Sequence, residues 1–222
     1  MIRKTVFAPG EYYHLYSRGS DKRTIFIDGS DYNRFVRLLY LCNGENPLIF
    51  KGISARITFE FDHGESLADI GCYCLMTNHF HILIREKKDC GITRFMKKLL
   101  TAYSMYFNKK YQRTGILFES RFKSSHVDKD EYLKYLFCYI HLNPIKMIEP
   151  HWKEEGISNL SNARRLLEEY PFSSYSDYTE GVRQERKILN KEAFPAYFNT
   201  PKDFTTYLND WIISKDGPWE EI

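Results

Sequence analysis

Residues 71–87 have the sequence GCYCLMTNHFHILIREK, which predicts two β-strands joined by a tight connection at Thr77-Asn78. In the second strand, His79 and His81 are two residues apart and therefore point to one face of the sheet, with Cα atoms about 6.5–7 Å apart. Phe80 between them points to the other face, into the core. The two imidazoles are close enough to share one metal ion. Exposed or hydrogen-bonded histidines on a sheet face would give the same short pattern.

The segments on either side of this hairpin predict an α+β domain. A strand is expected at 12–18, a helix at 30–42 capped by Ser30 or Asp31, an amphipathic helix of about twenty residues after Asp89, a short strand at 124–127 and a helix at 128–142. Apolar residues also alternate over 53–61, which suggests a further strand. The order strand, helix, strand, strand, helix, strand is that of a ferredoxin-like fold, an antiparallel sheet with helices on one face.

The pattern divides the 222 residues into two parts. Residues 1–150 are predicted to form the main domain, with an insertion at about 44–68. Residues 151–222 have a weaker pattern and are expected to be a C-terminal extension that packs on the domain and contributes to binding its partner.

Several classes of protein are disfavoured by the composition. The longest uninterrupted apolar run, Leu38 to Cys42, is far too short to cross a bilayer, and the N-terminal residues contain no apolar stretch of signal-peptide length. The five cysteines include no CxxC pair, which argues against a disulfide framework or a structural zinc site. We therefore expect a cytoplasmic protein with reduced thiols and no membrane partner.

The charge is unevenly distributed. Residues 94–123 hold eight basic residues against one acid, Glu119, so this segment carries +7 in a chain whose net charge is +3. Such a run is often a solvated helix face. Here aromatic residues are interleaved with the basic ones, a combination that suits a nucleic-acid backbone and unstacked bases.

A second motif lies on the helix expected at 128–142. Tyr139 and Asn143 are four residues apart and share a helix face. The amide oxygen of Asn143 is a possible third metal ligand, with Tyr139 beside it as a nucleophile. Spacing alone does not single out Tyr139, because Tyr135 and Tyr132 lie on the same side of the helix.

Five segments together resemble the REP-associated tyrosine transposases, which belong to the single-tyrosine HUH transposases. They are YYHLYSRGSDKRTIF (12–26), CLMTNHFHILI (74–84), GILFESRFKSSHV (115–127), YIHLNPIK (139–146) and YPFSSYSDY (170–178). The resemblance implies that His79 and His81 bind the metal, with Asn143 as third ligand, and that Tyr139 is the nucleophile. Thr77 stands where the family usually has proline, which should alter only the turn.

The activity implied by the resemblance is cleavage and rejoining of single-stranded DNA at hairpin-forming repeats through a 5′-phosphotyrosine intermediate. Two imidazoles and an amide oxygen suit a divalent cofactor, Mg²⁺ or Mn²⁺. The expected partner is single-stranded or hairpin DNA, bound by a monomer or homodimer. The residues expected to contact DNA are Arg18, Arg94, Lys97, Lys98, Lys109, Lys110, Arg113, Arg121 and Lys123.

Two other functions remain open from the sequence. The chain could be a domesticated relative that binds DNA without transposing it. It could also be a metal-dependent phosphodiesterase that uses water as the nucleophile. A covalent DNA adduct through tyrosine is required only by the transposase.

Overall fold

A four-stranded antiparallel sheet lies at the centre of the computed structural model, which describes residues 6–47, 53–179 and 181–213. The strands are β1 (Tyr12–Arg18), β2 (Ala68–Met76), β3 (His79–Glu86) and β4 (Lys123–Val127), in the spatial order β2-β3-β1-β4. This is the ferredoxin-like order, so the fold class expected from the sequence is confirmed.

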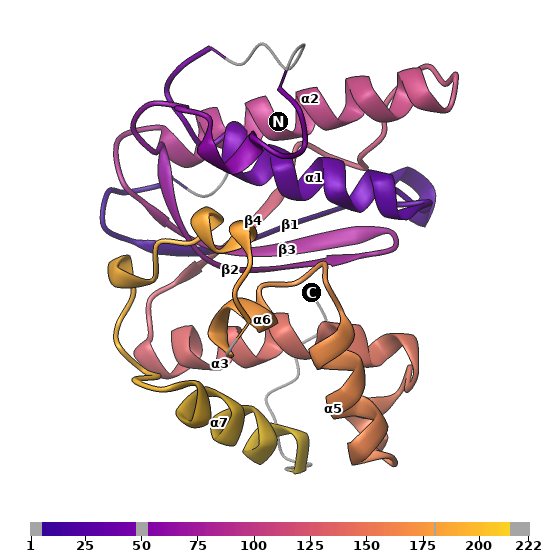
Figure 1. The fold of residues 1–222 in the computed structure, drawn as a ribbon, viewed down its shortest axis with the longest axis vertical. Helices are drawn as coiled ribbons and strands as arrows, with labels where there is room; N and C mark the ends of the chain where they lie inside the picture. Colours follow the sequence, from indigo (N-terminus) through magenta and orange to yellow (C-terminus); the bar gives the residue numbers. More distant parts are fainter. Residues whose placement is uncertain (1–5, 48–52, 180, 214–222) are drawn as a thin grey trace.

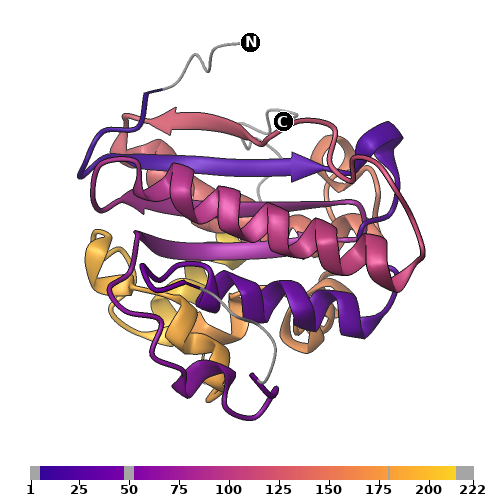
Figure 2. The ribbon, with the colours of Figure 1, turned by 90° about the horizontal axis from the view of Figure 1, so that it is seen from above.

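Helices form a layer on each face of the sheet (Figure 1). The two helices of the ferredoxin-like unit, α1 (Gly29–Leu41) and α2 (Gly91–Lys110), lie together on one face, and Figure 2 looks down onto this side. The opposite face is covered by α3 (Asp130–Leu142) and by the later helices α4 (Trp152–Glu155), α5 (Leu160–Glu169), α6 (Tyr175–Tyr178) and α7 (Pro201–Ile213). The second layer goes beyond the helices on one face that the sequence predicts.

The predicted hairpin is present, with Met76 paired to His79 across a turn at Thr77 and Asn78. Backbone amides of Ile25 and Phe26 both donate to the carbonyl oxygen of Thr77, at 2.9 and 3.1 Å. The turn is therefore anchored to the segment that leads into α1.

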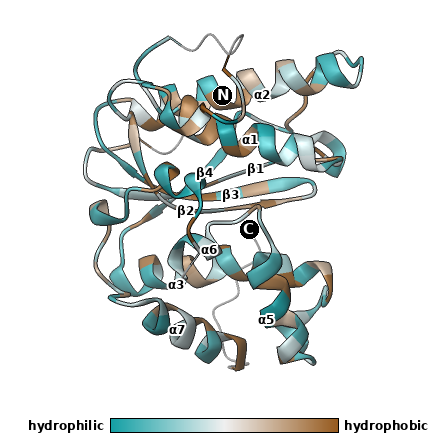
Figure 3. Cartoon of the chain, in the orientation of Figure 1, coloured by the Kyte–Doolittle hydropathy of each residue, from teal (hydrophilic) through white to brown (hydrophobic). Residues whose placement is uncertain are grey.

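Strand alternation separates two apolar cores. Phe80 and Ile82 point toward α1 and α2, where Phe80 packs against Phe35 with ring centroids 5.0 Å apart. Leu83 points the other way and packs with Leu136 and other residues of α3. Hydrophobic and hydrophilic residues alternate along the helices, as Figure 3 shows, so each helix has an apolar side to bury.

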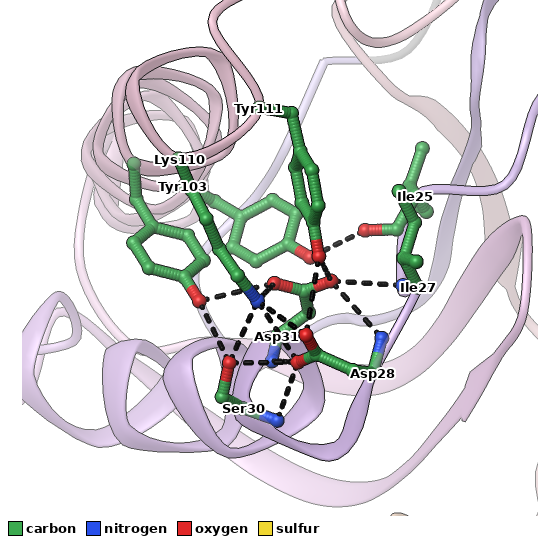
Figure 4. Close-up of polar contacts among 9 residues, drawn as sticks. Ile25, Ile27, Asp28, Ser30, Asp31, Tyr103, Lys110 and Tyr111 are labelled. Carbon is green, nitrogen blue, oxygen red and sulfur yellow. Dashed lines mark hydrogen bonds and ion pairs between the residues drawn. The ribbon is translucent and has the colours of Figure 1, made fainter.

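A polar cluster joins the start of α1 to the end of α2 (Figure 4). Asp28 caps α1 by accepting from the amide of Ser30 at 2.8 Å, whereas the sequence suggested Ser30 or Asp31 as the cap. Asp31 is fully buried and accepts from the amide of Ile27, the hydroxyl of Tyr111 and the ammonium of Lys110, at 2.8, 2.7 and 2.7 Å. Asp28 is the better cap because Asp31 then completes a capping box from the third helical position.

The strand predicted over 53–61 is wrong. This segment forms turns and a short 3₁₀ helix, Thr58–Glu60. Arg37 of α1 donates to the Thr58 hydroxyl at 2.6 Å and to the carbonyl oxygen of Ile53 at 2.7 Å, and Tyr40 donates to the carbonyl oxygen of Phe61 at 3.2 Å. The carbonyl oxygens of Ile53 and Phe61 are therefore bound by side chains of α1. Phe59 packs against Tyr40 in the core, whereas Ala55 and Ile57 are exposed.

The extension runs along the free edge of β2. The amide of Leu75 donates to Phe172 O, and the amide of Ser174 donates to Tyr73 O, both at 2.9 Å. Further along, the amide of Asn190 donates to Ile70 O at 2.9 Å. The contacts of Phe172, Ser174 and Asn190 thus satisfy backbone groups that an edge strand would otherwise expose, and every residue of β2 is buried.

Two expectations from composition can be compared with the fold. All five cysteines are free, and every one except Cys90 is buried, consistent with small core residues. Within the described ranges, none of the helices has the length and apolarity needed to cross a bilayer.

Replacing Asp31 should destabilise the fold. Asp31→Ala leaves the Ile27 amide and the Lys110 ammonium without their buried acceptor, so we expect a loss of roughly 2–3 kcal/mol in the free energy of unfolding, measured by urea unfolding followed by circular dichroism.

Burial raises the pKa of Asp31, but Lys110, Tyr111 and two backbone amides lower it more, so the net shift is downward. The contribution of Asp31 should therefore be complete at neutral pH and disappear as the pH falls below about 4. Asp28→Ala, at a half-exposed position, should cost less; an equal loss would contradict the central role of Asp31.

Candidate functional site

The two histidines of the hairpin lie on the α3 face of the sheet. His79 pairs in register with Arg18 and His81 with Tyr16, both on β1. Their ring centroids are 5.0 Å apart and the ring planes are nearly perpendicular, at 88°. His81 is only 3% exposed, whereas His79 is partly exposed. The shared face predicted from the sequence is confirmed.

Tyr139 of α3 lies over these histidines. Its ring centroid is 5.5 Å from that of His81 and 5.9 Å from that of His14, both in edge-to-face geometry. Tyr135, one turn earlier, instead packs against Trp211 of α7 at 5.1 Å. The ring contacts therefore distinguish two tyrosines that helical spacing leaves equivalent.

Asn143 is bound to the same helical turn as Tyr139. It is the first residue of a 3₁₀ helix that follows α3, and its amide Nδ2 donates to the carbonyl oxygen of Tyr139 at 2.7 Å. This bond uses the amide nitrogen and leaves the oxygen Oδ1 for another interaction. Asn143 is thus positioned as a buried amide beside Tyr139, and with Pro144 it also ends the α-helix.

The hydrogen bonds of the histidines fit metal ligation by Nε2. Nδ1 of His79 lies 2.7 Å from Oδ1 of Asn78, and Nδ1 of His81 lies 3.0 Å from Nε2 of His14. A ligating histidine usually donates its second ring N–H to such a neighbour, which fixes the ring. Among the described residues no three His, Cys, Asp or Glu side chains form a metal cluster, so an ion here would need oxygen ligands such as Asn143, water or a phosphate.

The surroundings keep these imidazoles neutral at pH 7. Burial, with smaller contributions from Lys146, Arg18 and Lys153, lowers the pKa of His79 to about 4. Burial likewise holds the pKa of His81 well below its usual value. Neutral imidazole is the form that binds a metal.

Positive charge also gathers on this side of the sheet. Lys153 of α4 places its ammonium 4.3 Å from the ring centroid of Tyr139. Through its charge, Lys146 acts on both His79 and His81, and Arg18 acts on His79. Arg18 also forms an ion pair with Glu119 at 3.1 Å. These cations would favour a phosphate next to Tyr139 and the histidines.

The basic residues of α2 lie on the opposite side of the sheet. The ammonium of Lys98 donates to the carbonyl oxygens of Gly44 and Asn46, and that of Lys110 binds Asp28 and Asp31. Both therefore connect parts of the fold.

Most of the remaining residues predicted to contact DNA are exposed, and Arg113 is partly buried. Arg94, Lys97 and Lys109 are exposed on α2, although Arg94 approaches Glu45 at 3.8 Å. Arg113 follows α2, Arg121 is exposed before β4, and Lys123 pairs with Glu119 at 3.2 Å. The predicted set is consequently spread over two faces, and DNA contact by these residues stays a prediction.

Three further residues of this site, His14, Lys146 and Lys153, are not indicated by a local sequence pattern. His14 lies inside the segment 12–26, where alternation puts it on one face of β1, but only the register of β1 with β3 brings it to His81. Lys146 follows the motif at 139–143 by three residues. Lys153 lies in the extension, and nothing in its local sequence indicates Tyr139 as a neighbour.

Comparisons with known proteins found a family match over part of the chain and one similar fold. Residues 51–143 match the family model described as "Transposase IS200 like". No curated protein sequence matches the chain. A solved structure described as a REP-associated tyrosine transposase bound to a REP hairpin is similar, with a TM-score of 0.52 and 12% sequence identity, over 83% of this chain and 90% of that one. At this identity the likeness establishes the shared fold.

Substitution of either histidine should remove metal binding. In His79→Ala and His81→Ala we expect Mn²⁺ affinity to fall by more than the 10- to 100-fold that loss of a supporting hydrogen bond costs, measured by titration of free Mn²⁺. Asn143→Ala should have a smaller effect, because a neutral amide contributes less than an imidazole. Circular dichroism checks the fold. Unchanged Mn²⁺ binding in the histidine variants would favour a purely structural histidine pair.

Proposed function

We propose that the chain is a metal-dependent tyrosine transposase that cleaves and rejoins single-stranded DNA, and the match of residues 51–143 to the IS200-like transposase family supports this. The observation that carries this proposal is the position of Tyr139. Its ring contacts His81 and His14, and its backbone holds the amide of Asn143. A nucleophile, two imidazoles and an amide are thus gathered on one side of the sheet.

The proposed reaction is a transesterification at phosphorus. The hydroxyl oxygen of Tyr139 forms a bond to the phosphorus while the bond to the 3′ oxygen breaks. The phenolic proton is lost and the leaving oxygen gains one, which yields a 5′-phosphotyrosine and a free 3′-OH. Attack by a 3′-OH reverses the step, so rejoining needs no external energy source.

A divalent ion held by His79, His81 and Asn143 would supply charge neutralisation at the scissile phosphate. The chain's own residues supply orientation. Asn78 and His14 hold the two imidazole rings by their Nδ1 atoms, and α3 fixes Tyr139 next to them. A phenol with a pKa near 10 is a weak nucleophile at neutral pH, so this placement matters for the rate.

The DNA strand is proposed to enter on the α3 side of the sheet. Tyr139 is 4% exposed, and the ammonium of Lys153 lies over its ring. An incoming phosphate would attract Lys153 and so expose the hydroxyl. Only a strand whose backbone is accessible can reach this site, which favours single-stranded DNA. Hairpin-forming repeats are the proposed targets, because the similar transposase is described as bound to a REP hairpin.

A domesticated DNA-binding relative and a phosphodiesterase both differ from the proposed transposase in that neither forms a covalent protein–DNA adduct. A domesticated relative would bind hairpin DNA and leave it intact, and a phosphodiesterase would release a nicked strand with no protein attached. The edge-to-face contact of Tyr139 with His81 favours tyrosine over water as the nucleophile. The proposal leaves a monomer or a homodimer as the active species.

Tyr139→Phe should abolish the covalent adduct. The substitution keeps the ring and its packing and removes only the hydroxyl, so the fold, Mn²⁺ binding and DNA affinity should persist. Labelled hairpin DNA incubated with Mn²⁺ and run on a denaturing gel should show neither adduct nor nick. Tyr135→Phe is the matched control on the same helix and should still cleave. A nick without adduct in wild-type protein would support the phosphodiesterase.

The salt dependence of DNA binding can distinguish the basic residues on the α3 side of the sheet, Lys146 and Lys153, from those exposed on α2, Lys97 and Lys109. Lys146→Ala combined with Lys153→Ala should weaken affinity for single-stranded DNA and reduce the log–log salt slope by about 1.4, since each phosphate contact on a single strand contributes about 0.7. Lys97→Ala with Lys109→Ala removes the same charge from the opposite face and should have a smaller effect, measured by fluorescence anisotropy. A larger effect in the second variant would assign DNA binding to the α2 face.

A further inference from the structure

His14 is a buried polar residue in the middle of the central strand β1. Its side chain is fully buried, and its ring is nearly parallel to that of His81, with centroids 5.1 Å apart and an interplanar angle of 24°. Nε2 of His14 lies 3.0 Å from Nδ1 of His81. A buried imidazole requires hydrogen bonds that an apolar residue at the same place would not.

The two rings share one proton along this bond. In the first arrangement, His14 Nε2–H donates to Nδ1 of His81. The proton of His81 is then on Nε2, and that nitrogen has no lone pair for a metal. In the second arrangement, His81 Nδ1–H donates to Nε2 of His14, which leaves the lone pair of His81 on Nε2.

The other nitrogen of His14 distinguishes the two arrangements. Nδ1 of His14 is buried and has no hydrogen-bond partner within the described residues. In the first arrangement this atom is an unpaired acceptor, and in the second it is an unpaired N–H donor. Orphaned buried N–H groups are the rarer and less favourable of the two. The second arrangement is therefore disfavoured unless something else stabilises the lone pair on His81 Nε2.

We propose that His14 is a positioning residue that accepts the Nδ1–H of His81 when a divalent ion binds, so that His81 Nε2 faces the ion unprotonated. The inference rests on the metal site of the proposed function. On metal binding, His81 Nε2 releases its proton to solvent, the shared proton moves from His14 Nε2 to His81 Nδ1, and His14 Nδ1 takes up a proton from solvent, so that the pair neither gains nor loses protons overall. The buried pair thus keeps one of the two ligating imidazoles oriented and in the correct tautomer.

His79 shows why this role is specific to His14. Nδ1 of His79 is already next to Oδ1 of Asn78, an acceptor that has no proton to exchange. The tautomer of His79 is therefore fixed by an amide at the end of the turn. His81 lies deeper in the strand, and within the described part of the chain the hydrogen-bond partner of its Nδ1 is another imidazole, which the register of β1 with β3 supplies.

The test compares two substitutions in the full chain. His14→Leu removes the acceptor, and His14→Gln can place its amide oxygen near the position of Nε2. We expect Mn²⁺ affinity to fall about 10- to 100-fold in His14→Leu and to be largely recovered in His14→Gln, with the fold checked by circular dichroism. In wild-type protein with labelled histidines, nuclear magnetic resonance should show His81 protonated at Nδ1 when Mg²⁺ is saturating.

The results that would overturn the role of His14 can be told apart from those that would overturn the metal site. Wild-type Mn²⁺ affinity in a folded His14→Leu would overturn the proposal, as would equal losses in the leucine and glutamine variants, which would indicate packing alone. The resonance measurement uses no variant, so a failure of His14→Leu to fold leaves it decisive: in saturating Mg²⁺, His14 should be protonated at Nδ1 and not at Nε2, and protonation at Nε2 would refute the role. Absence of Mn²⁺ binding in wild-type protein would instead overturn the metal site of the proposed function and this inference with it.

Discussion

The antiparallel register of β1 with β3 determines on which face of the sheet each side chain of the hairpin lies. Leu15 pairs with Ile82 and Tyr16 with His81, so one set of alternate residues faces α1 and α2 and the other faces α3. A slip of one residue would exchange the two sets. Phe80 and Ile82 would then leave the larger core, and His81 would enter it. Packing of aliphatic and aromatic residues on the α1 side therefore holds the imidazoles on the α3 side.

The second helical layer turns this sheet face into an enclosed site. In an antiparallel sheet with helices on one face only, His79 and His81 would lie on an open surface. Here α3 crosses that surface, and Tyr139 closes over the rings. The C-terminal extension (residues 151–222) also packs against α3. Trp211 packs on Tyr135, and the hydroxyl of Ser174 lies 2.7 Å from Nε2 of His141. The same extension protects the edge of β2.

Charge is used differently on the two faces. On the α1 and α2 side, Lys98 and Lys110 are bound to carbonyl oxygens and carboxylates, so these residues hold the fold together. On the α3 side, Lys146 and Lys153 lie near neutral imidazoles and an aromatic ring. A phosphate there would meet positive charge beside Tyr139 and the histidines, a position that a count of basic residues along the sequence does not reveal.

The sequence by itself determined the local elements and one motif. Alternation predicted the hairpin and the common face of His79 and His81, and the 3.6-residue period predicted α2 and α3, because these signals arise within a single strand or helix. Alternation over 53–61 predicted a strand that does not form, because carbonyl oxygens of this segment are bound by Arg37 and Tyr40 of α1.

Tyr139 was already indicated by the resemblance of residues 139–146 to the family, and its ring contacts place it against His81. Only the tertiary structure brought His14 and Lys153 to the site and separated the α2 cations from it. Each of these depends on the register between strands distant in sequence or on helix packing across the sheet, and no local pattern of residues encodes such long-range contacts.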